Sequence, residues 1–566
     1  MRVGLRSESV PTGEPIRNCY LMRIAPVLLA YAVVLGFGLF QSFGPTFTSG
    51  FARMQTERGD GMLNHYILEH SWQSITNPDY CGSLFSPPCF YPTRATLWYS
   101  EHLLGVAPIY WGLRVVMPYD FAYQWWQIIL NVMNFVSFAL VLRWLRTPHI
   151  LAMLGGYMWA FSLINLDQLK HQQMIPRFAM VLAAYHAWQF VMALGSTAAN
   201  PARHLNRMMA AVFLQGVTCV NTGWFLVAGL ATFIPLAVLL RRAGWWYLLC
   251  YLWNHSWRVM FILGGWAGAL LIAYIPYFVV NWGQERLYIE CVDLMPTAYA
   301  WFAPLPGTVW EPVLGSCRAA LLNECWLFCG FTIYGLMAVC AVALLLAMKT
   351  EGRRPELGVL LAALLTSVVW IVITMKIGDE QSLWKYIRHV PGGTAIRCVS
   401  RVYVIVYLFG VLAALVWLGG VTESLRPSIR CVVLGLIAVV CIVEQYGYDM
   451  PSFEKRDFYP IADRAAEELK KGHTGYIVPR YTDTSGDQLE TVYAEVLGMW
   501  AGLRANVPVV NGYSGRVPNE AFLQVVLSPD EFRETHLRKW LAGRFRGRVV
   551  LVEPGYPDKT RVIVFE

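Results

Sequence analysis

Acidic and histidine side chains gather between the first two long apolar runs of the chain. Asp60 stands between two glycines, and His65, Glu69 and Trp72 follow it at three- and four-residue spacing. That spacing places the three on one face of an amphipathic helix, with Asp60 as the expected N-cap. The neighbouring glycines also let a ligand approach the backbone and leave the carboxylate open. Asp60 is therefore either a capping residue or a general base, and His65 is a candidate for binding substrate.

Glu101 and His102 lie directly before another apolar segment, at the depth expected for a membrane interface. Ionisable side chains at this depth are costly, which favours a functional explanation. The alternative is structural, because Glu101 could cap a helix that starts at Ser100 and His102 could satisfy a local carbonyl. Glu101 is thus a second candidate catalytic acid, and His102 a second candidate substrate-binding histidine.

The turn at residues 165–173 is the third polar cluster, and it separates two apolar runs. It offers Gln168, His171 and Gln172 to the same cavity as the earlier acids, together with Asp167. Ordinary solvation of a loop is the alternative role for most of these side chains. We retain Gln168, His171 and Gln172 as candidate substrate-binding residues.

Basic residues gather near the ends of two late apolar runs. A cluster of bases at membrane depth needs an anionic partner, and lipid phosphates are the nearest general candidates. The alternatives are nonspecific contact with membrane lipid and a site for the phosphate or pyrophosphate of a lipid-linked substrate, which arginine can clamp with two hydrogen bonds. The candidate substrate-binding bases are Lys376, Arg397 and Arg401, with Lys385 and Arg388 nearby.

Composition defines the setting of these residues. Of 566 residues, 56% are hydrophobic and only 14% are charged, which is typical of a membrane protein. Several apolar runs reach the roughly 20 residues needed to cross a bilayer. We predict a mostly α, polytopic membrane protein with about eleven spans. They lie at about 24–43, 122–142, 150–165, 176–195, 207–221, 223–240, 257–280, 325–348, 357–376, 402–419 and 428–446.

The short basic loops predict the orientation of the chain. With a cytoplasmic N-terminus and eleven spans, every short basic loop lies inside, as the positive-inside rule requires. The same threading puts residues 44–121 in a large first external loop, and it places the late basic cluster outside, against the rule. Topology explains the net charge of +8 better than nucleic acid does. The inner loops hold Arg143, Arg146, Arg203, Arg207, Arg241, Arg242, Lys349, Arg353, Arg354, Arg426 and Arg430.

The chain changes character after the last span. A charged amphipathic stretch at 461–471 and short β-like runs at 476–479, 507–510, 549–552 and 562–565 indicate a small α/β domain. We therefore divide the chain into a membrane domain at 1–446 and an extracytoplasmic domain at 447–566. A Gly-rich turn at 508–515 either faces the membrane domain or is only structural.

The external loops also contain cysteines and further acids. Cys81 with Cys89, and Cys291 with Cys317, are either disulfides of an oxidising compartment or free thiols. The spacing of His and Cys does not indicate a zinc site. Glu290, Asp293 and Glu324 add external carboxylates.

In the order of its external motifs, the chain resembles the bacterial GT-C glycosyltransferases, in particular the dolichyl-phosphate-mannose-protein mannosyltransferase-like proteins of undefined substrate. The resemblance implies a GT-C-like fold in the bacterial inner membrane, with the C-terminal domain periplasmic or extracellular. It implies transfer of a sugar from a polyprenyl-phosphate donor to an external glycan, lipid or protein, with Asp60 at the position of the catalytic acid. The matching motifs are Gly59-Asp60, Phe90-Tyr-Pro92, Ser100-Glu-His102, the turn 168–172, the stretch 391–401 and Asn511-Gly-Tyr-Ser-Gly515.

One departure from the family concerns metal. Asp60 has no adjacent second acid, so we expect a metal-independent, inverting transfer, and a divalent metal is the one cofactor left open. In this hypothesis Asp60 deprotonates the acceptor while Arg397 and Arg401 stabilise the departing phosphate. The alternative function is a transporter or flippase of a lipid-linked sugar. Such proteins usually show internal repeats and broken helices at mid-membrane, neither of which is clear in this sequence.

Overall fold

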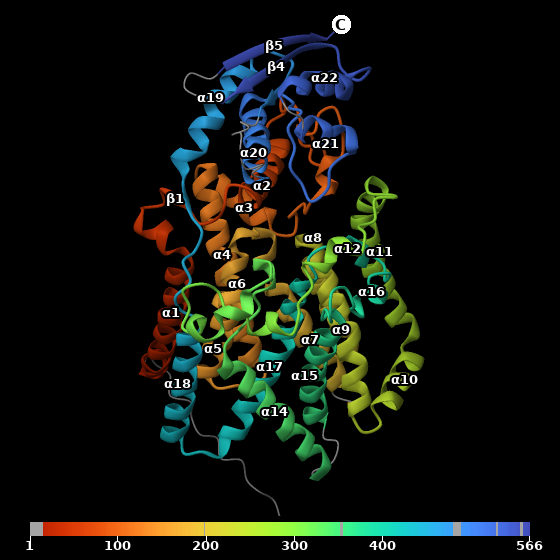
Figure 1. The fold of residues 1–566 in the computed structure, drawn as a ribbon. Coiled ribbons are helices and arrows are strands. Elements are labelled where there is room, and N and C mark those ends of the chain that lie inside the picture. Colours follow the sequence, from red (N-terminus) through yellow and green to blue (C-terminus); the bar gives the residue numbers. More distant parts are fainter. Residues whose placement is uncertain are drawn as a thin grey trace, which may run out of the picture.

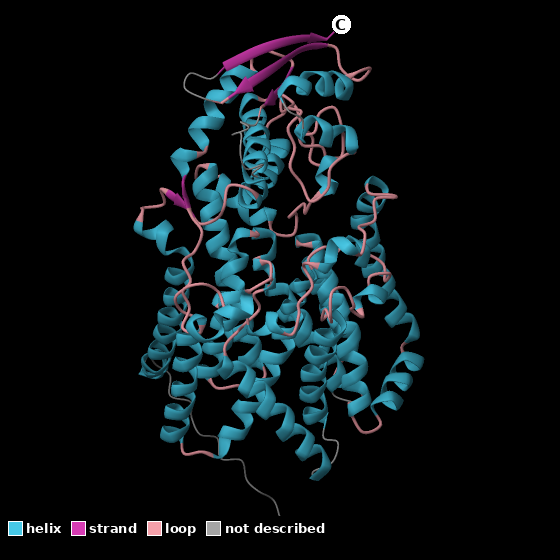
Figure 2. Ribbon diagram, in the orientation of Figure 1, coloured by secondary structure: helices cyan, strands magenta, loops and turns pink. Residues whose placement is uncertain are grey.

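A computed structural model describes residues 15–196, 199–350, 355–478, 488–527, 530–554 and 559–565. Long helices form a bundle, and the first large loop and the C-terminal tail lie together at one end of it (Figures 1 and 2). The expected cytoplasmic N-terminus, the basic pair Arg353 and Arg354, and Pro479 at the end of one expected strand fall outside the described residues.

The described part of the chain contains nine helical stretches that are long and apolar enough to cross a membrane. This confirms a mostly helical, multi-pass protein, and each stretch overlaps one of the eleven expected spans. The stretches are Ala25–Thr48 of helix α1 (Pro15–Thr48), α4 (Tyr119–Trp144), His149–Lys170, α9 (Val220–Leu240), α11 (Ser256–Val280), α14 (Phe331–Thr350), α15 (Pro355–Thr374), Val399–Ser424 and α18 (Pro427–Glu444).

The other two expected spans are also helices, but they differ from the rest. Helix α7 (Phe178–Ala193) has only 16 residues, and α8 (Pro201–Thr218) begins with a charged first half. Asn200 caps α8 by accepting a hydrogen bond from the backbone N–H of Arg203. The two helices pack on each other. The remaining α-helices of this part are α5 (His149–Phe161), α6 (Leu163–Asp167), α10 (Gly244–Asn254), α12 (Ile289–Val292), α13 (Glu311–Leu314), α16 (Trp384–Ile387) and α17 (Tyr403–Val421).

The first loop contains two short helices, α2 (Asp60–Thr76) and α3 (Ala107–Arg114). Its strand β1 (Arg53–Met54) pairs antiparallel with β2 (Phe453–Glu454) at the start of the tail. The loop and the tail are therefore tied together at the point where each leaves the bundle.

The tail forms a three-stranded sheet with helices packed against it. Strand β3 (Thr474–Ile477) runs parallel to β4 (Gly547–Glu553), and β4 pairs antiparallel with β5 (Lys559–Phe565). The sheet region is the expected α/β element, although the run at 507–510 contributes only an isolated bridge between Val509 and Gly475. The tail helices are α19 (Tyr459–Leu469), α20 (Gln488–Ala505), α21 (Glu520–Leu527) and α22 (Asp530–Leu541).

The loop and the tail share one hydrophobic core. Trp500 of α20 is fully buried and donates its indole N–H to the backbone oxygen of Met62 on α2, 3.1 Å away. Trp540 of α22 makes the equivalent bond to the backbone oxygen of Tyr91, at 2.8 Å. These contacts place the tail turn at 511–516 over the end of the helix bundle.

Neither expected cysteine pair forms a disulfide in this structure. Cys81, Cys89, Cys291 and Cys317 are all free. The thiol of Cys291 donates instead to the backbone oxygen of Ile396, at 3.3 Å.

Candidate functional site

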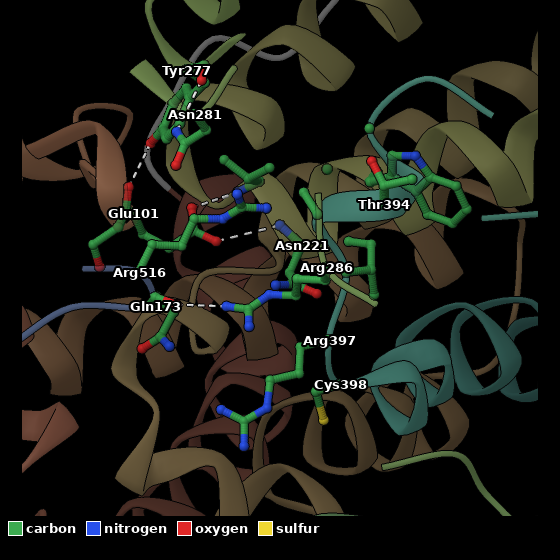
Figure 3. A pocket seen from close by; sticks show the side chains of 18 of the residues that line it. Glu101, Gln173, Asn221, Tyr277, Asn281, Arg286, Thr394, Arg397, Cys398 and Arg516 are labelled. Atoms are coloured by element: carbon green, nitrogen blue, oxygen red, sulfur yellow. Dashed lines mark hydrogen bonds between the residues drawn. The ribbon is translucent and has the colours of Figure 1, made fainter. Parts of the chain in front are cut away.

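A cavity of about 1620 Å³ lies where the first loop, the tail and the helix bundle meet. Its wall includes the early acids Asp60 and Glu101, His171 of the third polar cluster, and the late bases Arg397 and Arg401. Figure 3 shows this chamber from close by, with Glu101, Arg286, Arg397 and Arg516 among the labelled side chains. Five of the ten candidate site residues are thus brought to one chamber.

Asp60 is held from two sides. Its Oδ2 lies 2.8 Å from Nδ1 of His171, and its Oδ1 accepts a 2.7 Å hydrogen bond from the hydroxyl of Tyr513 in the tail. Asp60 is the first residue of α2, and Gly59 occupies the cap position, so the expected N-cap role was wrong. Burial alone would raise the pKa of Asp60, but the bonds from His171 and Tyr513 and the charges of His171 and Arg401 bring it below its ordinary value.

His171 bridges two carboxylates. Its Nε2 lies 3.4 Å from Oε1 of Glu324, on the side opposite Asp60. Burial by itself would lower the pKa of His171, yet its bonds to Asp60 and Glu324 raise it to about 9. The imidazole is therefore protonated at neutral pH.

Glu324 continues the chain of charges to an arginine. Arg401 Nη2 lies 3.7 Å from its Oε2. Burial would raise the pKa of Glu324, but the charge of Arg401 and the bond from His171 hold it far below its ordinary value. Asp60, His171, Glu324 and Arg401 thus alternate in sign, with no net charge.

Glu101 uses both carboxylate oxygens to cap a helix. Its Oε2 accepts the backbone N–H of Val220 at 2.6 Å, and its Oε1 accepts that of Asn221 at 3.4 Å. These are the first free N–H groups of α9, which begins at Val220. The capping alternative at Glu101 therefore has direct support, although the helix is α9 and not one that starts at Ser100. Burial raises the pKa of Glu101.

Five candidate substrate-binding residues do not line this cavity. His65 is buried in the core shared by loop and tail, where its ring stacks on Tyr123 with centroids 4.2 Å apart and its Nδ1 lies 2.9 Å from the hydroxyl of Tyr459. The other four are His102, Gln168, Gln172 and Lys376. The Nδ1 of His102 accepts the backbone N–H of Leu104, and Gln168 is buried. Gln172 donates to Thr56 and to the backbone oxygen of Leu169.

The reason for these corrections is packing. A polar side chain in a loop points into a cavity only if its neighbours leave space there, and local spacing does not reveal this. The expectation that Gln168 and Gln172 line the same cavity as Asp60 was wrong for this structure, and the candidates His65, His102 and Lys376 also lie outside the cavity wall.

Several lining residues escaped sequence reasoning as site residues, among them Arg286, Glu324, Tyr513 and Arg516. Glu324 was visible only as one of several external acids, and Tyr513 only as part of a Gly-rich turn. Arg286 gave a usable signal, because it is a charged residue that closely follows the apolar run of α11.

The donor atoms that could hold a divalent cation are those of Asp60, His171 and Glu324. Oxygen and imidazole ligands suit such metals, but His171 would first have to lose its proton. Among the described residues, no three His, Cys, Asp or Glu side chains are arranged around one point as a metal site requires.

No protein-family model matches this chain, and no curated protein matches its sequence. Among solved structures it is similar to the archaeal oligosaccharyltransferase AglB from Archaeoglobus fulgidus, in complex with an inhibitory peptide and a dolichol-phosphate. The TM-score is 0.49 at 10% identity, over 92% of this chain and 69% of that one. It is also similar to apo ArnT from Cupriavidus metallidurans, with a TM-score of 0.38 at 11% identity over 94% and 93% of the two chains. Because both scores lie below 0.5, function is inferred from the chamber itself.

Away from its charged end, the cavity has an apolar wall. Helices α8, α9 and α11 supply this surface, and all three belong to the helix bundle. A ligand that fills the chamber would thus be amphipathic, with a polar head near Asp60 and an apolar chain between helices. The apolar lining comprises Val212, Val227, Ala231, Leu270, Leu271 and Phe278.

Proposed function

We propose that this protein is a membrane glycosyltransferase that moves a sugar from a polyprenyl-phosphate donor to an acceptor on the non-cytoplasmic face of a bacterial inner membrane. One observation carries the proposal. The cavity brings together three features: the carboxylate of Asp60, which His171 holds in place, the unpaired guanidinium group of Arg397, and an apolar wall between helices. The acceptor is a glycan, a lipid or a protein that presents a hydroxyl.

The reaction is a single displacement at the anomeric carbon. The acceptor oxygen forms a bond to C1 of the sugar while the bond from C1 to the phosphate oxygen breaks, and the electron pair leaves with the phosphate. The acceptor proton passes to Asp60. Attack opposite the leaving group inverts the anomeric configuration.

Arg397 and Arg401 have different parts in this mechanism. Arg401 is engaged with Glu324, so it positions the chain of charges that orients Asp60. Arg397 is exposed to the cavity and, within the described residues, makes no hydrogen bond or ion pair. Arg397 is therefore the residue that stabilises the negative charge on the departing phosphate.

Tyr513 marks the place of the acceptor. Its hydroxyl donates to Oδ1 of Asp60, the same kind of bond that an acceptor hydroxyl would make. An acceptor that reaches Asp60 must displace this hydroxyl. The lowered pKa of Asp60 keeps the carboxylate ionised and ready to accept that bond.

We retain the expectation of metal-independent transfer, in which the protonated His171 supplies the positive charge beside Asp60. Transfer should continue in the presence of a chelator. Loss of transfer on chelation, with recovery on adding Mn²⁺ or Mg²⁺, would assign His171, Asp60 and Glu324 to a metal instead.

The decisive experiment is to supply purified protein with radiolabelled polyprenyl-phosphate sugars and membrane acceptors, and to compare wild type with Asp60→Asn. We expect transfer to fall by about two orders of magnitude or more, because a positioned base contributes about 10²–10⁴-fold. Binding of the lipid should persist. Asp79→Asn, in an exposed part of the same loop, is the matched control.

Two outcomes contradict the proposal. Equal transfer by wild type and Asp60→Asn would remove Asp60 as the base. Movement of the lipid across vesicles without any glycosylated product would instead identify a flippase.

A further inference from the structure

Three arginines from three separate segments line the chamber in addition to Arg401. Arg286 follows α11, Arg397 precedes α17, and Arg516 lies in the tail turn beside Tyr513. Figure 3 labels all three around the same space. Burial and the nearby charge of Arg286 lower the pKa of Arg516, while the charges of Glu290 and Glu285 act in the opposite direction. Gathering guanidinium groups in this way is unfavourable unless anions share them.

Protein carboxylates neutralise only part of this positive charge. His171 and Arg401 are balanced by Asp60 and Glu324, and Arg286 pairs with Glu290 at 3.1 Å. In the described part of the chain, neither Arg397 nor Arg516 has a hydrogen bond or an ion pair within 4 Å.

The other acids of the wall do not fill this role. The pKa of Glu57 is raised by burial and by the charge of Asp60, and this carboxyl makes no ion pair with Arg397 or Arg516. Glu101 is committed to the start of α9. Glu285 is exposed and makes no ion pair among the described residues, although its charge acts on Arg516. Two guanidinium groups, those of Arg397 and Arg516, therefore remain without a carboxylate in contact.

We propose that the donor is linked to its lipid through a diphosphate, with one phosphate at Arg397 and the other at Arg516 beside Arg286. This rests on the function proposed above and narrows its donor class. A phosphate diester carries one negative charge and would leave one guanidinium unmatched. A diphosphate diester carries two, so each of the two unpaired guanidinium groups can bind one phosphate through paired N–H bonds.

The arrangement also connects the donor to the tail. Arg286 donates to the backbone oxygen of Gly515 at 2.5 Å, which joins the loop after α11 to the tail turn. Arg516 and Tyr513 belong to the same turn. A diphosphate seated on Arg516 thus fixes the turn whose tyrosine occupies the acceptor position at Asp60.

The test uses the full-length protein in nanodiscs and two probes without sugar, the methyl esters of undecaprenyl monophosphate and undecaprenyl diphosphate, which are diesters like the sugar-linked donors and carry one and two negative charges. The dissociation constant of each is measured for wild type, Arg516→Ala, Arg516→Gln and Arg397→Ala. Arg546→Ala, at an exposed tail position away from the cavity, is the matched control. Arg516→Gln retains much of the side-chain length if the alanine variant proves unstable.

We expect wild type to bind the diphosphate about tenfold or more tightly than the monophosphate, since one charge-assisted contact is worth at least that factor. Both Arg516 variants should lose this preference and keep their affinity for the monophosphate. Arg397→Ala should weaken the binding of both lipids.

Equal affinity of wild type for the two lipids, or a preference for the diphosphate that survives in both Arg516 variants, would overturn the proposal of a diphosphate-linked donor. If Arg397→Ala still weakens both lipids in that case, the proposed glycosyltransferase stands with a monophosphate donor. Failure of wild type to bind either lipid would overturn both proposals.

Discussion

The electrostatics of single side chains determine what the chamber can do. His171 lies between two carboxylates, so its proton is stabilised from both sides against the cost of burial. The same proton keeps Asp60 and Glu324 ionised. One histidine therefore sets the charge state of the candidate base and of its neighbour.

This arrangement predicts a pH-dependent stability. The folded-state pKa of His171 is raised from 6.5 to about 9, so its contribution is complete below about pH 6.5 and is lost as the pH rises through 9. A shift of this size corresponds to at most about 3 kcal/mol. His171→Gln should thus melt well below wild type at pH 6, and the difference should shrink by pH 10.

The measurement is thermal unfolding in detergent across this range. His255→Gln, at an exposed position of the bundle, serves as control. A difference between wild type and His171→Gln that stays constant from pH 6 to pH 10 would show that His171 is not charged in the folded protein.

The positions of these side chains depend on how the ends of helices and the turns are held. Glu101 comes from the first loop but holds the start of α9, and Glu444 at the end of α18 accepts the backbone N–H of Phe331 at the start of α14. In both cases a carboxylate from a distant segment satisfies N–H groups that a helix cannot satisfy itself. The link from Glu101 to α9 holds part of the chamber wall in place.

Glu101→Ala should destabilise the protein by about 1–3 kcal/mol, because it leaves N–H groups of α9 buried without a partner. Glu101→Gln retains an acceptor oxygen and should keep most of the transfer activity. Melting temperature and transfer rate are measured on the same preparations. Loss of transfer in Glu101→Gln at an unchanged melting temperature would instead make Glu101 a catalytic acid.

The tail turn that contains Tyr513 has no room for a larger side chain at Gly512. A Cβ added to Gly512 would lie 2.3 Å from Cδ1 of Phe90, a ring that is buried in the shared core. Gly512→Ala should therefore displace the turn, lower the melting temperature and reduce transfer about tenfold or more, as misplacement of a site by about 1 Å commonly does.

The control is Gly420→Ala in α17, where an added Cβ meets nothing within 4 Å. If Gly512→Ala matched it in both melting temperature and transfer rate, the turn would not need to hold its position for the reaction.

At the scale of the whole molecule, the chamber lies at one end of the helix bundle. The first loop and the tail share a hydrophobic core at one end of the bundle, while the start of α18 lies near the opposite end (Figure 1). If helices cross the bilayer as expected, the chamber opens toward the non-cytoplasmic face. This orientation remains a prediction from the charges of the loops.

Two exposed cysteines test the orientation directly. Cys81 lies in the first loop, and Cys431 lies near the start of α18, directly after Arg430. A membrane-impermeant maleimide should label Cys81 in spheroplasts, and it should label Cys431 only after permeabilisation. Site-resolved mass spectrometry separates the two products. Labelling of Cys431 without permeabilisation would invert or break the proposed topology.

The sequence by itself determined the helical class of this protein, the positions of nine helical stretches and the sheet region in its tail. These depend on local properties, namely the length of an apolar run and the period of its side chains. It also singled out Asp60 and His171, because charged groups next to apolar runs are visible in one dimension.

Only the tertiary structure decided which of these groups meet. His171 is 111 residues from Asp60, and Tyr513 is 453 residues away from it. Packing likewise buries His65 in the core, and it brings Glu101 to the start of a helix that begins 119 residues later. Contacts across such separations depend on how whole elements pack and on which polar groups burial leaves without water, and no local pattern records either.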